Sequence, residues 1–160
     1  MPAASIIGSG VIGAGWAARF LLHGWDVSLY DPHPDTPRKF ANVMDNARNS
    51  FPKLYPSELP KEGKLSLSNS LSCAVSEASW IQESVPERLP IKFETLSAIQ
   101  KSCDPNAIIC SSTSGFTPSE LHNGLSRPEQ ILVAHPYNPV YLLPIVELVP
   151  SRLVSEDLIQ

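Results

Sequence analysis

The stretch "SIIGSGVIGAGWAARF", residues 5–20, determines the fold class that we predict for this sequence. A short apolar strand, Ala3–Gly8, leads into a turn with three glycines. A helix is expected over Val11–His23, because apolar residues recur there every three or four positions. A glycine-rich turn between a strand and a helix is typical of dinucleotide-binding domains. The same glycines would also suit a tight turn without any ligand, so the surrounding sequence has to decide.

Asp31 supplies that context, because it follows the apolar strand Asp26–Tyr30 and lies 18 residues after Gly13. A carboxylate at the end of the second strand accepts hydrogen bonds from a ribose and repels a 2′-phosphate, which favours NAD over NADP. The alternative is that Asp31 only caps the turn before Pro32. The residues expected to hold the cofactor are Gly8, Ser9, Gly10, Val11, Ile12, Gly13 and Asp31.

Strand and helix patterns alternate along the rest of the chain. Further helices are expected over Pro37–Phe51, Leu71–Glu77, Arg88–Lys101 and Pro118–His122, and further strands over Leu65–Leu67, Trp80–Glu83, Ala107–Cys110, Ile131–Ala134 and Ile145–Val149. Short and almost wholly apolar strands are typical of a parallel sheet that is buried on both faces. The sequence therefore predicts an α/β domain of the Rossmann type, a doubly wound, mostly parallel sheet with helices on both faces.

Composition narrows the classes of function. The chain has 160 residues, enough for one domain, and a formal net charge of −4. It has no basic patch, so we expect neither nucleic acid nor an anionic membrane surface as a partner. No apolar run approaches the roughly 18 residues needed to span a bilayer, and no metal site is predicted. Three widely spaced cysteines fit a reducing compartment, so a cytoplasmic location is expected.

Two ionisable residues stand out in "VAHPYNPVYLLPIVELV", residues 133–149. Glu147 lies alone among apolar residues, and a carboxylate buried there would need a partner. His135 closes the preceding strand, and neighbouring strands could bring the two side chains together. A carboxylate that orients a histidine makes it an effective general base. The alternative is a structural histidine and a glutamate that faces solvent on an edge strand, and the spacing alone leaves both open.

Four hydroxyl side chains, residues 111–114, follow the expected strand Ala107–Cys110. Ligands of open α/β sheets bind at the carboxyl ends of the strands, so a serine there could bind a substrate oxygen. Ordinary capping of the helix that begins near Pro118 is the alternative.

Five stretches, in this order along the chain, resemble the 3-hydroxyacyl-CoA dehydrogenase superfamily: "GSGVIGAGWAARF", "YDPHP", "IQESVPERLPIK", "SSTSG" and "AHPYNPVYLLPIVELV". The resemblance implies NAD-dependent oxidation of a secondary alcohol to a ketone. By motif, His135 is the catalytic base, Glu147 its orienting carboxylate, and Ser114 the serine on the substrate hydroxyl.

The resemblance also implies further cofactor contacts. Glu87 and Lys92 match positions that line the cofactor in the family, and Glu83 lies nearby in the sequence. Ser112 is expected near the nicotinamide, although acyl-CoA members typically carry asparagine at that position.

Within the superfamily, the quoted stretches are most similar to members that act on L-carnitine. This implies oxidation of its 3-hydroxyl to 3-dehydrocarnitine. Another 3-hydroxy acid or its CoA ester, such as L-gulonate or 3-hydroxybutyryl-CoA, is an alternative substrate. A non-catalytic, crystallin-like NAD-binding protein is a third possibility. A quaternary ammonium favours aromatic faces, and Tyr137, Tyr141 and Phe116 are the local candidates unless they only pack the loop.

We expect residues 1–150 to form the NAD-binding domain and residues 151–160 to begin a linker or helix toward a second domain. Family members continue with a helical domain that closes over the substrate and usually makes the dimer. The resemblance therefore implies weak turnover by these 160 residues alone, and a homodimer only where that second domain is present. We also expect exposed apolar surface around Leu142, Leu143 and Leu153.

Overall fold

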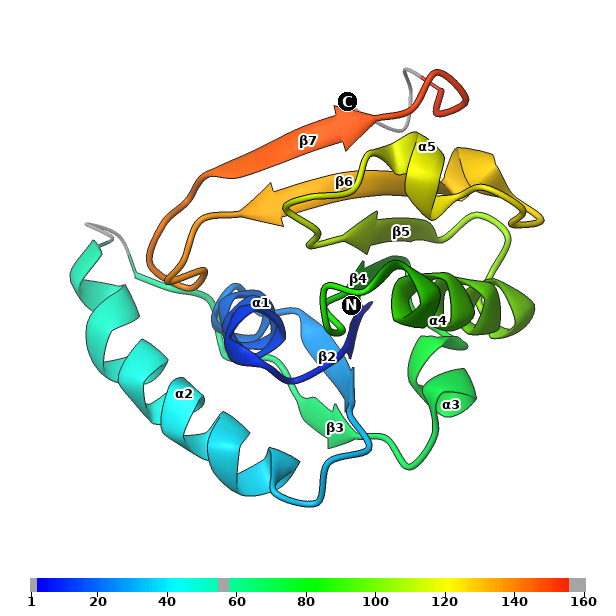
Figure 1. Cartoon of the computed structure of the whole chain (residues 1–160). Coiled ribbons are helices and arrows are strands. Elements are labelled where there is room, and N and C mark those ends of the chain that lie inside the picture. The colour runs from blue at the N-terminus through cyan, green and yellow to red at the C-terminus, as the bar shows by residue number, and fades with distance from the viewer. Residues whose placement is uncertain (1–2, 55–57, 156–160) are drawn as a thin grey trace.

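The computed structural model describes residues 3–54 and 58–155. Within these residues one sheet has the strand order β3-β2-β1-β4-β5-β6-β7 (Figure 1). Its strands are β1 (Ala3–Ile7), β2 (Asp26–Tyr30), β3 (Leu65–Leu67), β4 (Trp80–Glu83), β5 (Ile108–Ser111), β6 (Ile131–Pro136) and β7 (Val146–Pro150). Neighbouring strands are parallel except β6 and β7, which are antiparallel. The mostly parallel, doubly wound sheet is therefore confirmed.

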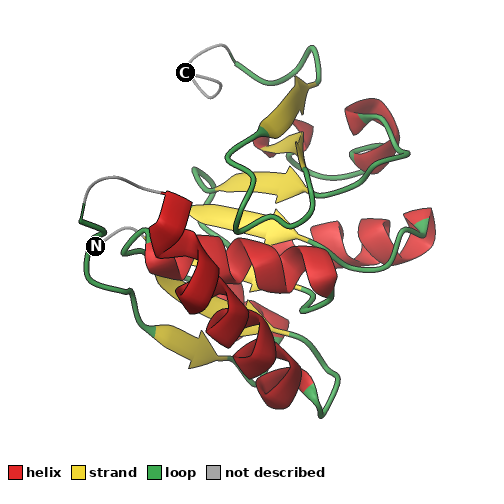
Figure 2. Ribbon diagram, turned by 90° about the vertical axis from the view of Figure 1, so that its left-hand side faces the viewer, coloured by secondary structure: helices red, strands yellow, loops and turns green. Residues whose placement is uncertain are grey.

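Helices cover both faces of this sheet. They are α1 (Val11–Leu22), α2 (Thr36–Ser50), α3 (Leu71–Val75), α4 (Leu89–Ser102) and α5 (Pro118–Leu121), with short 3₁₀ helices at Phe51–Leu54 and Pro128–Gln130. Figure 1 shows α1 and α2 on one side of the sheet and α3 and α4 on the other. In Figure 2 the helices lie against the stack of strands, and the strand nearest the C-terminus lies at its upper end.

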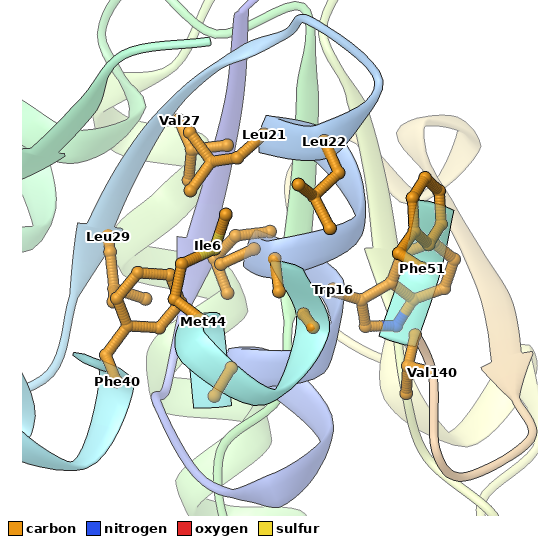
Figure 3. Close-up of a cluster of buried hydrophobic side chains, with 14 residues drawn as sticks. Ile6, Trp16, Leu21, Leu22, Val27, Leu29, Phe40, Met44, Phe51 and Val140 are labelled. Carbon is orange, nitrogen blue, oxygen red and sulfur yellow. The ribbon is translucent and has the colours of Figure 1, made fainter. Parts of the chain in front are cut away.

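Alternation along β1 separates the two cores. Ile6 belongs to the cluster under α1 and α2, whereas its neighbour Ile7 belongs to the cluster under α3 and α4. Figure 3 shows the first cluster, in which Phe40 and Met44 of α2 meet β1 and β2. Phe51 is also fully buried there, at the start of the 3₁₀ turn that ends α2. Burying one such side chain contributes about 1.5–3 kcal/mol, so these contacts hold the helices on the sheet.

The two edge strands differ from the predicted pattern. All residues of β3 and β7 are exposed, although apolar strands of this kind are typical of a sheet that is buried on both faces. The reason is topological, because each of these strands has a single neighbour in the sheet. Exposed apolar surface near the end of the chain was expected, and Leu143 and Leu153 are exposed, but Leu142 is half-buried. A linker or helix was expected over residues 151–160; residues 151–155 form no helix, and residues 156–160 lie outside the described residues.

None of the described helices has the length and apolar character that crossing a membrane requires.

Candidate active site

A cleft of about 930 Å³ lies at the carboxyl ends of β1 and β4. These strands are neighbours, and the order of the sheet reverses between them, which is where ligands of open α/β sheets bind. Gly8, Gly10 and Ser84 line one part of the cleft, and Asp31 and Glu94 line another. Three of the residues expected to hold the cofactor, Gly8, Gly10 and Asp31, therefore line a space of the size of a small-molecule site.

The three glycines of the turn have different reasons for being glycine. Gly8 has a φ of +96°, which L side chains rarely adopt. A Cβ on Gly13 would lie 1.9 Å from the carbonyl oxygen of Gly8, so α1 could not approach β1. A Cβ on Gly10 would meet nothing within 4 Å, so the fold does not require glycine there. Open backbone at the start of a helix fits the close approach of a pyrophosphate, and this turn therefore fits NAD.

Asp31 is tied to the same turn. Its Oδ2 accepts hydrogen bonds from the backbone N–H of Ser9 at 2.7 Å and from the Ser9 hydroxyl at 2.8 Å, and its Oδ1 accepts one from the backbone N–H of His33. Burial by itself would raise the pKa of Asp31, but these hydrogen bonds outweigh it and hold the pKa below its ordinary value. The carboxylate is therefore ionised at neutral pH and keeps free lone pairs for a ribose hydroxyl.

His135, Glu147 and Ser114 lie together at the β6 side of the sheet. The Nδ1 of His135 is 3.0 Å from Oε2 of Glu147, and its Nε2 is 3.1 Å from the Oγ of Ser114. An ionised carboxylate can only accept, so the imidazole proton is assigned to Nδ1 and Nε2 is left as an acceptor. The expected proximity of the three side chains is thus present, and the imidazole has the orientation that a general base needs.

The sequence left open whether Glu147 is buried or faces solvent on an edge strand, and the structure shows that it faces solvent while still pairing with His135. Its side chain is 58% exposed, and that of His135 is 29% exposed. Glu147 lies on the edge strand β7, where solvent reaches the carboxylate from the open side. The pairing with His135 therefore comes from the strand register and not from burial of an unpaired charge.

A buried ion pair supports the loop that carries Ser114. Lys92, 1% exposed, donates to both carboxylate oxygens of the fully buried Glu83 and lies 3.2 Å from Glu87. Glu87 accepts hydrogen bonds from the backbone N–H groups of Ser114 and Gly115, each at 3.0 Å. Burial alone would raise the pKa of Glu87, but hydrogen bonds from its neighbours and the Lys92 charge hold the pKa below its ordinary value. A direct contact of Glu87 or Lys92 with the cofactor stays a prediction.

Helix capping, the alternative for the serines, belongs to another residue. Thr117 forms a capping box with Glu120 at the start of α5. The Ser114 hydroxyl bonds the imidazole instead.

Ser112 contacts residues that the sequence did not single out. Its Oγ lies 2.8 Å from the Oγ of Ser84, which lines the cleft, and accepts a hydrogen bond from the amide of Gln82. Gln82 is fully buried. The available signal was an amide side chain inside the short strand "WIQE", where an apolar residue is usual.

The three aromatic candidates are not equivalent. Tyr141 is half-buried against the cluster under α1 and α2, and Phe116 packs against the cluster under α3 and α4. Tyr137 is 42% exposed, and its ring centroid lies 5.8 Å from that of His135. Tyr137 is therefore the candidate that presents an aromatic surface beside the imidazole.

Comparison with known proteins also indicates a dehydrogenase domain that binds NAD. Residues 3–160 match the family model described as 3-hydroxyacyl-CoA dehydrogenase, NAD binding domain. The chain is 58% identical over 160 residues to an L-carnitine dehydrogenase/betainyl-CoA thioesterase of Ruegeria pomeroyi, covering all of this chain and 33% of that protein. It is 50% identical over 147 residues to an L-carnitine dehydrogenase of Mesorhizobium japonicum, covering 91% of this chain and 40% of that protein.

The chain thus spans between about a third and a half of the length of the curated relatives that it matches. Among solved structures, it is similar to (S)-3-hydroxybutyryl-CoA dehydrogenase PaaH1 from Ralstonia eutropha, with a TM-score of 0.83 and 23% identity over 99% of this chain and 57% of that one. At this identity the likeness shows a shared fold.

Proposed function

This chain belongs to the family of 3-hydroxyacyl-CoA dehydrogenase NAD-binding domains, and from that membership we propose that it serves an enzyme that oxidises the 3-hydroxyl of L-carnitine to 3-dehydrocarnitine. The observation that carries the proposal is the arrangement of His135 between Ser114 and Glu147, in a chain whose cleft at the carboxyl ends of β1 and β4 fits NAD. The names of the two relatives support L-carnitine as the substrate.

In the proposed reaction, bound NAD supplies the hydride acceptor. His135 takes the proton of the substrate hydroxyl at its Nε2. In the chain without substrate, this nitrogen is hydrogen-bonded to the hydroxyl of Ser114. Ser114 then holds the substrate oxygen next to the imidazole. Glu147 accepts from Nδ1 and stabilises the imidazolium that forms when the proton arrives.

The proposed substrate, L-carnitine, fits the aromatic side chain that lies beside the proposed base. L-carnitine carries a quaternary ammonium, which an aromatic face can bind, and Tyr137 is exposed beside His135. Asp31 supports NAD over NADP, because its ionised carboxylate repels a 2′-phosphate.

The organisation of the whole protein belongs to the same proposal. Residues 1–150 are proposed as the NAD-binding domain, with residues 151–160 leading onward and with dimerisation dependent on a second domain. A cytoplasmic location is proposed, because Cys73, Cys103 and Cys110 are free thiols, as in a reducing compartment.

The test is NADH formation with L-carnitine, L-gulonate and 3-hydroxybutyryl-CoA in parallel. It is run on this chain and on a version extended to the length of the relatives, each with His135→Asn as the inactive control. The proposal expects L-carnitine to be oxidised, and only where His135 is intact. A higher kcat/KM for either other substrate would refute L-carnitine as the substrate. NAD binding without turnover of any substrate in either version would indicate a non-catalytic protein.

A further inference from the structure

Three polar side chains follow one face of β4. Successive side chains in a strand alternate between faces, so Trp80, Gln82 and Ser84 share one face, while Glu83 points to the other. The indole Nε1–H of Trp80 donates to Oε1 of Gln82 at 3.1 Å. An indole N–H can only donate, so this contact fixes which end of the Gln82 amide is oxygen and which is nitrogen.

The amide nitrogen of Gln82 must then act as a donor. It donates to the Oγ of Ser112 at 2.8 Å and, more weakly, to the carbonyl oxygen of Ala134 at 3.5 Å. Gln82 is fully buried, and both ends of its amide have partners. Because Ser112 accepts from Gln82, its hydroxyl proton is directed away from the amide, toward Ser84 or toward the cleft.

Ser84 completes the sequence of hydrogen bonds. The Oγ atoms of Ser84 and Ser112 lie 2.8 Å apart, and a single hydrogen bond between them uses one of their two hydroxyl protons. The other proton has no acceptor within this group of side chains. Ser84 lines the cleft together with Gly8 and Gly10, and both serines are only half-buried. The pair therefore presents one outward O–H donor at the cleft.

We propose that this donor binds the carboxamide oxygen of the nicotinamide, and that Gln82 and Trp80 are positioning residues that direct it. The proposal rests on the proposed function, which places the nicotinamide near His135. Ser112 is two residues from Ser114, which bonds His135, and its partner Ser84 reaches the glycine turn. The donor thus lies between the proposed pyrophosphate site and the proposed base, where a nicotinamide would lie. With an apolar residue at position 82, the amide that donates to Ser112 and accepts no proton from it would be gone, and the hydroxyl protons of the serine pair would lose their fixed direction.

The test compares two ligands by calorimetry on the full 160-residue chain: NAD and ADP-ribose, which lacks the nicotinamide. Gln82→Met keeps the length of the side chain and removes its hydrogen bonds. We expect the Kd for NAD to rise roughly three- to tenfold, the effect of one ordinary net hydrogen bond, and the Kd for ADP-ribose to stay within about twofold. Trp80→Phe removes the indole N–H that donates to Gln82 and no other polar group. It is expected to raise the Kd for NAD by a smaller factor than Gln82→Met does.

A second ligand pair keeps the test decisive where a variant binds weakly overall. The sulfur of thionicotinamide adenine dinucleotide is a poorer acceptor than the carboxamide oxygen, so the native chain is expected to prefer NAD and Gln82→Met to lose that preference. Equal weakening of NAD and ADP-ribose would mean that Gln82 is only structural and would overturn the inference. If Gln82→Met does not fold, an unchanged preference in Trp80→Phe overturns it. Absence of binding of either NAD or ADP-ribose by the native chain would refute the cofactor site itself and the inference with it.

Discussion

His135 and Glu147 stand directly opposite each other in the antiparallel ladder of β6 and β7. Side chains at opposed positions share one face of the sheet, with Cβ atoms about 4.5–5.5 Å apart. The 3.0 Å contact between Nδ1 and Oε2 is therefore a product of strand register. A slip of one residue would turn Glu147 to the other face of the sheet.

Removing the carboxylate should release the imidazole tautomer. In the native chain, neutral His135 should hold its proton on Nδ1, whereas in Glu147→Leu both tautomers should be populated, as read from the ring nitrogen shifts in NMR at alkaline pH. Glu77→Leu, at an exposed position far from the imidazole, is the matched control. In the extended protein, Glu147→Leu should lose part of the roughly 10²–10⁴-fold that a positioned base contributes to kcat. An unchanged tautomer would contradict this orienting role.

Two alanine substitutions should separate folding from cofactor binding in the glycine turn. Gly13→Ala places a Cβ 1.9 Å from a backbone oxygen, and should lower the free energy of unfolding by about 3 kcal/mol or more. Gly10→Ala meets nothing within 4 Å, so it should fold normally but bind NAD at least about tenfold more weakly, because the methyl group keeps the pyrophosphate away from the backbone. Urea unfolding and calorimetry measure the two effects. Native affinity in Gly10→Ala would exclude a close pyrophosphate.

The buried pair of Lys92 and Glu83 should show strong coupling. Lys92→Met leaves the fully buried carboxylate without its cation and should cost roughly 3–5 kcal/mol of unfolding free energy. Adding Glu83→Gln to Lys92→Met removes the stranded charge and should recover a large part of that loss. A double-mutant cycle in urea measures the coupling. Simple additivity of the two single changes would show that the pair does not act as a unit.

Glu87 should make the loop at Ser114 sensitive to acid. Because the fold holds the pKa of Glu87 below its ordinary value, its stabilisation is present above the pKa of the unfolded chain and is lost as the pH falls through the lower native pKa. Glu87→Gln should therefore lower the free energy of unfolding at neutral pH, by less than about 1 kcal/mol since the carboxylate is 45% exposed, and match the native chain in strong acid.

Amide exchange gives the local readout for Glu87. The N–H groups of Ser114 and Gly115 donate to its carboxylate, so both should exchange faster in Glu87→Gln at neutral pH. Glu129→Gln, at an exposed position away from this loop, should leave their exchange unchanged. Equal exchange in the native chain and in Glu87→Gln would mean that other contacts hold the loop.

The sequence predicted the parts of the molecule that depend on local pattern. Apolar periodicity and the glycine turn were sufficient for the strand and helix positions and for the cleft beside Asp31. The pattern could not show that Glu147 is exposed, because an apolar edge strand has the same composition as a buried one. The contact between Gln82 and Ser112 joins residues 30 positions apart on neighbouring strands, and only the packed sheet brings them together.

The hydrogen bonds between Asp31 and Ser9 also affect the thermodynamics of cofactor binding. They join the end of β2 to the turn before α1 in the free chain, and Thr36 holds the Ser9 hydroxyl from α2. Each side chain that is immobilised at the moment of binding costs about 0.5–1.5 kcal/mol of binding free energy. Here that loss of conformational entropy occurs during folding, so the turn is preorganised when it meets its ligand.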